Sequence, residues 1–186
     1  EIFMNRIAVF DSSGNFVKRF GSPGSDCNQW NVSYSFAIYN DRIYIADHYG
    51  HRIVVLDLNG GCIATPGTGI NGPVAITVGS TGTFVSHYAG GSIGSYITTY
   101  NTTGSLNYTG WNAMGTGNIS LTFGMNLNSA GNKLIIADDL NNTLVEYNVS
   151  GTNIGTRSNI TNTSSNWGTS NYRFKKPFDA AYDSSG

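Results

Sequence analysis

The chain has 186 residues, a formal net charge of -1 and only 11% charged residues. This length suits one domain with a buried core, and the small charge excludes both a basic nucleic-acid footprint and an acidic disordered tail. No apolar run approaches the roughly 18 residues that a membrane-spanning helix needs, so we expect no membrane span.

The first 21 residues, EIFMNRIAVFDSSGNFVKRFG, predict short strands separated by turns. Three longer segments follow at about 31–67, 72–110 and 118–157, and they repeat one order: an apolar strand, a Gly or Asp turn, a second strand ending near Ala-Asp, a polar turn, and two further strands. A polar connector at about 156–171 precedes residues 172–186, whose end, FDAAYDSSG, matches the first strand and turn FGMNLNSAG of the third copy. Copies start about 40 to 50 residues apart, which is the spacing of four-stranded propeller blades.

The strand segments are apolar at successive positions, for example at 43–46, 53–56 and 134–137. Both faces of such a sheet need cover, and stacked blades provide it because each lies between two neighbours. No segment has a sustained helical period with caps, so helix content should be near zero. We therefore predict an all-β fold, a single β-propeller domain over 1–186 with four four-stranded blades, one of them split between residues 1–21 and 172–186.

The split blade has two interpretations. The N-terminal strands could close the ring against the C-terminal strand of the same molecule, which removes sheet edges from solvent. The same pairing could instead form between neighbouring molecules or tandem units, a heterologous contact that builds an open fibre where it does not close. The sequence leaves both open. Because the chain begins at Glu1 without a methionine, we expect either a removed leader or a segment of a longer protein.

Three motifs, RIYIADHYGHRIVVLDLNGG, NRIAVFDSSGNFVKRFGSPG and KLIIADDLNNTLVEYNVSG, resemble NHL repeats. That pattern has a strand ending in Val-Ala-Asp, a turn with Asn or His before Arg-Ile, a strand ending in Asp-x-x-Gly, and an aromatic-Gly close. The second copy departs from it, since His87 replaces the Asp and Gly94-Ser95 replace the His-Arg pair. The resemblance implies a binding scaffold with partners on its flat faces, in a family whose members mostly have six blades. One enzymatic branch, resembling the amidating lyases, uses a metal and histidines.

The first candidate site is the cluster Asp47, His48 and His51. Two histidines beside a carboxylate could bind zinc if their nitrogens converged, but this spacing on a turn between strands does not put them on one face. Asp138 fills the Asp47 position in the third copy, and Asn5-Arg6 matches His51-Arg52. We therefore favour a structural role, in which the carboxylate accepts backbone N–H bonds and the arginine reaches the next layer.

The other candidate chemistry is weaker. A metal-dependent lyase would need His48 or His87, and the chain has only three histidines. Asp138-Asp139 with Asn141 and Asn142 could hold calcium, but the loop lacks a regular ligand spacing and a solvated turn is favoured. No G-x-S-x-G elbow is present. We predict no catalytic residue, no metal and no cofactor. RNA binding has weak support, from the basic residues that could gather where the chain ends meet: Arg6, Lys18, Arg19, Arg173, Lys175 and Lys176.

N-linked glycosylation is the most informative surface prediction. The N-x-[ST] sequons are Asn31, Asn101, Asn107, Asn118, Asn141, Asn148, Asn159 and Asn162. Several lie in expected turns and connectors, where a glycan would be accessible and solubilising. The alternative is an Asn- and Thr-rich surface without sugar. Cys27 and Cys62 permit one disulfide, although two unrelated thiols remain an alternative.

Together these features predict a non-enzymatic extracellular or cell-surface glycoprotein scaffold, a structural propeller unit that assembles into a fibre or surface layer. Its expected partners are copies of itself and N-linked glycans, with no nucleic acid. The first alternative is a monomeric propeller that binds a protein or carbohydrate ligand on one face, with Trp30, Trp111 and Trp167 as candidate contacts. The second is a metal-dependent lyase of the amidating-lyase type.

Overall fold

The structure is a computed structural model that describes residues 2–66, 70–88, 95–100, 119, 122–150, 153–159 and 174–183. Its described residues contain a short 3₁₀ helix and thirteen strands, and no α-helix. In chain order the elements are η1 (Ile2–Met4), β1 (Ile7–Phe10), β2 (Phe16–Phe20), β3 (Phe36–Tyr39), β4 (Arg42–Asp47), β5 (Arg52–Asp57), β6 (Cys62–Ala64), β7 (Pro73–Gly79), β8 (Gly82–Tyr88), β9 (Ser95–Tyr100), β10 (Thr122–Leu127), β11 (Lys133–Asp138), β12 (Thr143–Ser150) and β13 (Asn153–Asn159). The predicted all-β class is confirmed.

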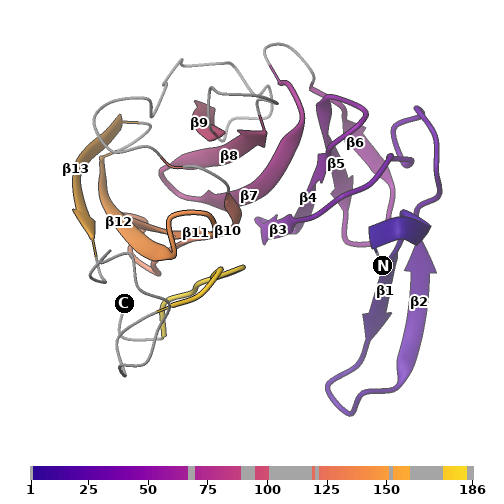
Figure 1. Ribbon diagram of the computed structural model, residues 1–186. Helices are drawn as coiled ribbons and strands as arrows, with labels where there is room; N and C mark the ends of the chain where they lie inside the picture. Colours follow the sequence, from indigo (N-terminus) through magenta and orange to yellow (C-terminus); the bar gives the residue numbers. More distant parts are fainter. Residues whose placement is uncertain are drawn as a thin grey trace.

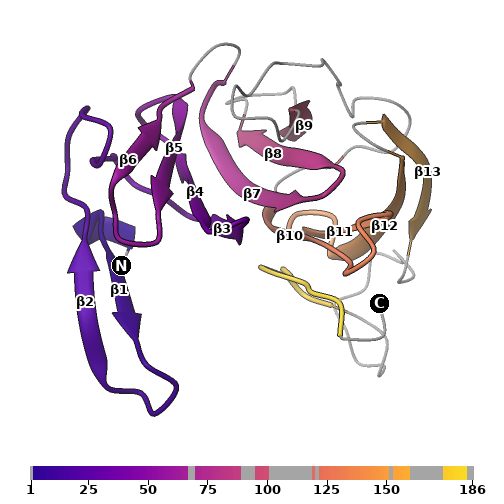
Figure 2. The ribbon, with the colours of Figure 1, turned by 180° about the vertical axis from the view of Figure 1, so that it is seen from behind.

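The strands form antiparallel sheets that follow the order of the chain. A β1-β2 hairpin is followed by the sheets β3-β4-β5-β6, β7-β8-β9 and β10-β11-β12-β13. The sheets succeed one another around an arc, and the hairpin stands well apart from residues 174–183, drawn in yellow, in both views (Figures 1 and 2). The fourth strand expected within 72–110 falls on residues outside the described part of the chain.

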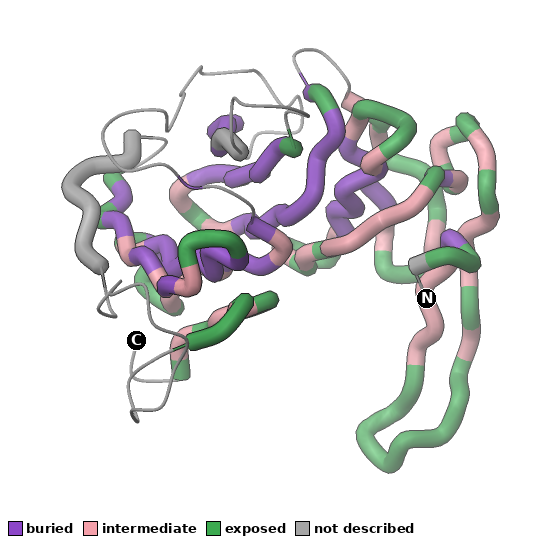
Figure 3. The backbone as a smooth tube through the Cα atoms, viewed as in Figure 1, coloured by how far each residue is buried: buried purple, intermediate pink, exposed green. Residues whose placement is uncertain are grey.

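Three apolar clusters fill the spaces between successive sheets. The first joins the hairpin to the β3–β6 sheet through Trp30, Ile43, Ile45, Val54 and Leu56, with Ile7 and Phe20 packed against them. The second joins that sheet to β7–β9, and the third joins β7–β9 to β10–β13. Inner strands such as β4 and β8 are buried along nearly their whole length, whereas the hairpin is largely half-buried or exposed (Figure 3). Cover on both faces is what the apolar sequences of these strands require.

The turn before the third strand of a repeat has the same backbone in three places. Asn5, His51 and Asn142 all lie in the left-handed region, with φ of 50°, 53° and 54°. Asn tolerates this conformation better than most residues with a Cβ. These positions are therefore turn residues of a repeated unit, which agrees with the match of Asn5-Arg6 to His51-Arg52.

The two chain ends differ in how they are placed. Residues 2–4 form η1 where a second strand was expected, because the left-handed Asn5 follows directly and no room is left for a full turn. Residues 174–183 carry no assigned strand, yet they lie along β10: the Asn126 side chain donates to the Ala180 carbonyl at 2.8 Å, and Phe178 stacks on Phe123 at 4.7 Å. No strand pair among the described residues joins the two ends, so the shared blade stays a prediction.

One expected boundary can be compared with the elements. Strand β13 continues to Asn159, so the first residues of the expected connector belong to a strand. A disulfide joins Cys27, in the loop after β2, to Cys62 in β6, with a Cα–Cα distance of 5.5 Å. It ties the loop that follows the hairpin to the outer strand of the next sheet.

Candidate functional site

The Asp47 turn is a closed hydrogen-bond network. Asp47 is fully buried, and its Oδ1 accepts N–H bonds from Asn31 at 2.7 Å and Gly50 at 3.1 Å. Its Oδ2 accepts the Arg52 Nε–H at 2.8 Å, and the Arg52 Nη2 donates to the carbonyls of Asp26 at 3.0 Å and Gln29 at 2.8 Å. The carboxylate and the arginine thus anchor the loop that crosses from the hairpin, which is the structural role expected for them.

The three histidines all bond to one short segment, residues 71–73, at the start of β7. His48 Nδ1 lies 3.2 Å from the Pro73 carbonyl, His51 Nδ1 accepts the Gly72 N–H at 3.0 Å, and His87 Nδ1 lies 2.9 Å from the Asn71 carbonyl. Burial lowers the pKa of His87 to about 4, against a smaller opposing effect of the Asn71 backbone. The described residues hold no group of three or more His, Cys, Asp or Glu arranged to bind a metal.

The Asp138 turn is self-satisfied in a similar way. Asp138 is fully buried, and its carboxylate accepts the Asn141 N–H at 3.3 Å and the Asn141 Nδ2–H at 2.9 Å. Asn142 donates its backbone N–H to the Asp139 carbonyl at 3.3 Å and accepts the Lys176 N–H at 2.9 Å through its side chain. The Asp138 carboxylate and the Asn142 side-chain oxygen, which a calcium ion would need, therefore already accept hydrogen bonds.

The sequons and basic residues are spread over the molecule. Asn31, Asn141 and Asn148 are exposed, and Asn159 ends β13. Asn101, Asn107, Asn118 and Asn162 lie outside the described residues, as does Arg173. The hairpin end carries Arg6, Lys18 and Arg19, whereas Lys175 and Lys176 lie with the yellow segment at the other side (Figure 1). The described basic residues of the two chain ends therefore do not form one cluster.

The aromatic surface differs from the expected one. Trp30 is only 2% exposed and packs under the hairpin, so it is not an exposed aromatic contact on a flat face; Trp111 and Trp167 lie outside the described residues. The aromatic surface that the structure does form is a pocket of about 310 Å³ lined by Tyr34, His48, Tyr49, Val74, Tyr88 and Phe123. These residues come from separate sheets and turns, so no local sequence pattern predicts that they share a pocket.

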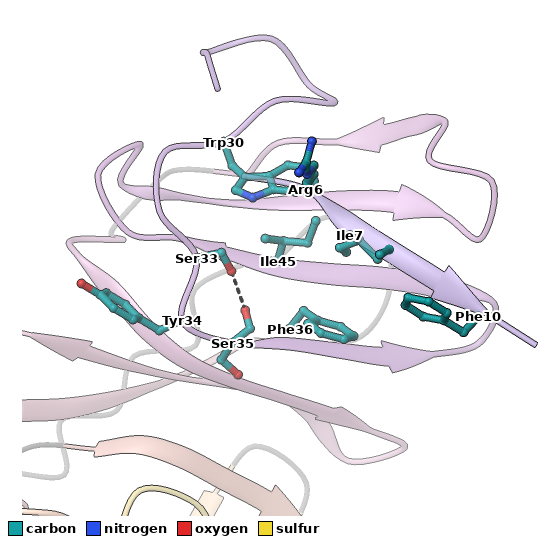
Figure 4. A pocket seen from close by; sticks show the side chains of 10 residues that line it. Arg6, Ile7, Phe10, Trp30, Ser33, Tyr34, Ser35, Phe36 and Ile45 are labelled. Atoms are coloured by element: carbon teal, nitrogen blue, oxygen red, sulfur yellow. Dashed lines mark hydrogen bonds between the residues drawn. The ribbon is translucent and has the colours of Figure 1, made fainter. Parts of the chain in front are cut away.

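The most unusual surface is an apolar cleft between β1 and β3, here called the open-end cleft. It has a volume of about 350 Å³ and is lined by Ile7, Ala8 and Phe10 on one side, Phe36 and Ile45 on the other, and Arg6, Trp30 and residues 33–35 at its end (Figure 4). Phe36 is 53% exposed and Ile38, two residues further along β3, is 58% exposed.

Strand register shows what is abnormal about these two side chains. Phe36 pairs with Ile45, two residues before Asp47, in the way that Ile76 pairs with Val85 and Met125 with Ile136 in the following sheets. Ile76 and Met125 are only 2% and 3% exposed. The face of β3 that looks toward the preceding sheet is therefore partly uncovered, because the two-stranded hairpin is the only sheet that the described residues place there.

Comparison with known proteins bears on the fold. No family model and no curated protein matches the chain. Solved structures do: virginiamycin B lyase from Staphylococcus aureus is 19% identical over 84% of this chain and 49% of its own, with a TM-score of 0.55. The Kuenenia stuttgartiensis hydrazine synthase is 12% identical over 84% and 43%, with a TM-score of 0.61. A nidogen/laminin complex is 14% identical over 86% and 59%, with a TM-score of 0.63.

The lyase and the nidogen/laminin structure are β-propeller proteins, which confirms the predicted propeller fold and is consistent with NHL-like blades. At these identities the likeness concerns the fold alone. The chain spans between 43% and 59% of the length of these structures. Among the described residues, no helix has the length and apolar character to cross a bilayer.

Proposed function

We propose that this chain is a non-enzymatic extracellular glycoprotein scaffold, a propeller unit that associates with copies of itself into a fibre or surface layer. The observation that carries the proposal is the open-end cleft, lined by Phe36, together with Ile38 beside it on β3, because both side chains are exposed where the equivalent side chains of the next sheets are buried. Exposed apolar surface of this kind marks interaction sites in folded proteins. Phe36 and Ile38 are 53% and 58% exposed, so covering them removes about half of each side chain from water and contributes about 1 to 1.5 kcal/mol each.

Two features support an extracellular location. The disulfide between Cys27 and Cys62 is a bond that persists in oxidising compartments. The sequons Asn31 and Asn148 are exposed and could accept glycans without disturbing a core. A glycan at either position would also hydrate a surface that carries few charges.

The arrangement of the histidines supports a non-enzymatic role. Each of the three bonds to the backbone of residues 71–73, so their nitrogens face a peptide segment instead of one another. A metal lyase of the kind considered above would need such nitrogens to converge. Elemental analysis of protein purified without chelators should find no stoichiometric metal, and bound zinc that is lost in His48→Ala would reverse this part of the proposal.

Sedimentation velocity of the secreted chain over a range of concentrations tests the association. We expect the sedimentation coefficient to rise with concentration and Ile38→Asp to abolish the rise, because a carboxylate cannot be buried without a partner. Leu140→Asp is the matched control, since Leu140 is 56% exposed on the turn between β11 and β12. A wild-type chain that stays monomeric throughout would overturn the proposal.

Intact mass before and after enzymatic deglycosylation tests the glycans. An unchanged mass would show that the chain carries none and would remove this part of the proposal.

A second candidate function rests on the aromatic pocket. Tyr34, Tyr49, Tyr88 and Phe123 offer ring faces and hydroxyl groups around a concave site, which suits a protein or carbohydrate ligand. Binding of oligosaccharides or peptides by an obligate monomer, lost in Tyr49→Ala and Tyr88→Ala, would favour this function over the scaffold.

A further inference from the structure

The first strands of successive sheets contact one another around the inside of the arc. The Ile76 N–H of β7 donates to Ser35 Oγ, just before β3, at 3.3 Å, and the Leu127 N–H of β10 donates to Thr77 Oγ1 of β7 at 3.4 Å. Each first strand thus presents one side to the strand before it and the other side to the strand after it. The small residues Ala75 and Thr77 lie on the side of β7 that receives β10.

Residues 178–183 continue this series beyond β10. Phe178 stacks on Phe123 with an interplanar angle of 8°, and the Tyr182 hydroxyl donates to Glu146 at 3.0 Å. Their sequence also matches the first-strand pattern of β10, which places Ala180 at the Met125 position and Ala181 at the Asn126 position. In this segment Ala181 is exposed, whereas Asp179 contacts β10 at Gly124 and at the Asn126 side chain. No further first strand among the described residues follows this segment.

Strand β3 lacks a neighbouring first strand on its other side, the side that looks toward the preceding sheet. Its Phe36 and Ile38 occupy the positions that Ile76 and Val78 fill in β7, and those side chains pack into the preceding sheet. What is missing next to β3 is therefore a first strand with small residues on its free side. Within one molecule the hairpin and residues 178–183 stand apart (Figures 1 and 2), so the molecule's own segment does not occupy the open-end cleft.

We infer that residues 178–183 of a second copy of this chain seat in the open-end cleft against Phe36 and Ile38. The inference rests on the proposed self-association and identifies the two surfaces that meet, which are the open-end cleft of one copy and residues 178–183 of the other. Ala181 then meets Ile38 as Thr77 meets Leu127 within one molecule. The contact joins two different surfaces, so it generates either a ring or an open fibre.

Cross-linking between two tagged populations tests this contact directly. One population carries Ile38→Cys, the other carries Ala181→Cys with a different tag, and both keep the native disulfide. After mixing and treatment with a short bis-maleimide, we expect a cross-linked species that carries both tags. Replacing Ala181→Cys by Leu140→Cys in the second population is the matched control and should give no such species.

The outcomes separate this inference from the proposed function. No cross-link in a chain that still associates would overturn the inference and leave the self-association standing. A third variant carries both Ile38→Cys and Ala181→Cys. A cross-link inside this molecule while the chain stays monomeric would overturn both the inference and the proposed function, because the ring would then close on itself. As a further variant, Ala181→Lys places a cation against Ile38 and should weaken association by about tenfold or more. An equal unfolding midpoint for this variant shows that the chain still folds, and unchanged association would count against the inference.

Discussion

The stability of this protein should fall steeply in mild acid because of His87. The side chain is fully buried in β8, with Nδ1 beside the Asn71 carbonyl and Nε2 beside Thr98 Oγ1. Burial lowers its pKa from the ordinary value of 6.5 to about 4. Between these two pH values the unfolded chain holds a proton on this residue and the native chain does not.

The size and sign of the effect follow from proton linkage. Stability rises with pH wherever the unfolded state binds more protons, so it is lost as the pH falls from 6.5 toward about 4 and levels off below that. This difference in the pKa of His87 between the unfolded and native chains corresponds to about 3 kcal/mol in the free energy of unfolding. That is a large part of the stability of a typical domain.

Urea unfolding followed by tryptophan fluorescence, repeated from neutral pH down to about pH 4, measures this loss. We expect His87→Asn to lose most of the pH dependence that the wild type shows in this window. His51→Asn is the matched control, since His51 is exposed and its left-handed backbone suits asparagine. Equal pH dependence in the wild type and His87→Asn would refute the reasoning.

Two further predictions concern stability. Replacing Cys27 and Cys62 by Ser should lower the free energy of unfolding by about 4 kcal/mol, because the bond closes a loop with a sequence separation of 35; equal urea midpoints with and without the bond would contradict this. Gly21→Ala should destabilise strongly, since an added Cβ at a φ of 95° would overlap the buried Trp30 ring. Gly14→Ala is the control, because an added Cβ at Gly14 meets no atom and only the unfavourable φ of 82° remains, which costs about 1 kcal/mol of stability. Similar losses of unfolding free energy in the two variants would argue against the overlap with Trp30.

Local patterns explain how much of the fold was predictable. Continuous apolar runs such as those of β4 and β11 require cover on both faces, and the repetition of these runs leads to stacked sheets. The roles of Asp47 and Arg52 were also predictable, because the Asp recurs as Asp138 and the His-Arg pair as Asn5-Arg6. A structural role predicts such recurrence, whereas a catalytic role has no need of it.

The features that could not be predicted from the sequence depend on contacts between different sheets. The three histidines meet at residues 71–73 because a turn of one sheet and strand β8 of the next face the same segment, which no spacing within one repeat reveals. Trp30 was expected on a binding face, yet it fills the space between the hairpin and the next sheet. Its burial depends on how those sheets pack and on the glycine that makes room for its ring.

Electron cryomicroscopy of the associated secreted chain tests the central claim most directly. The account predicts that the open-end cleft holds an extended segment with the side chains of residues 178–183, connected to a neighbouring molecule, with Phe36 and Ile38 covered by it. An associated species in which this cleft is empty, or is filled by the molecule's own C-terminal segment, would contradict the account.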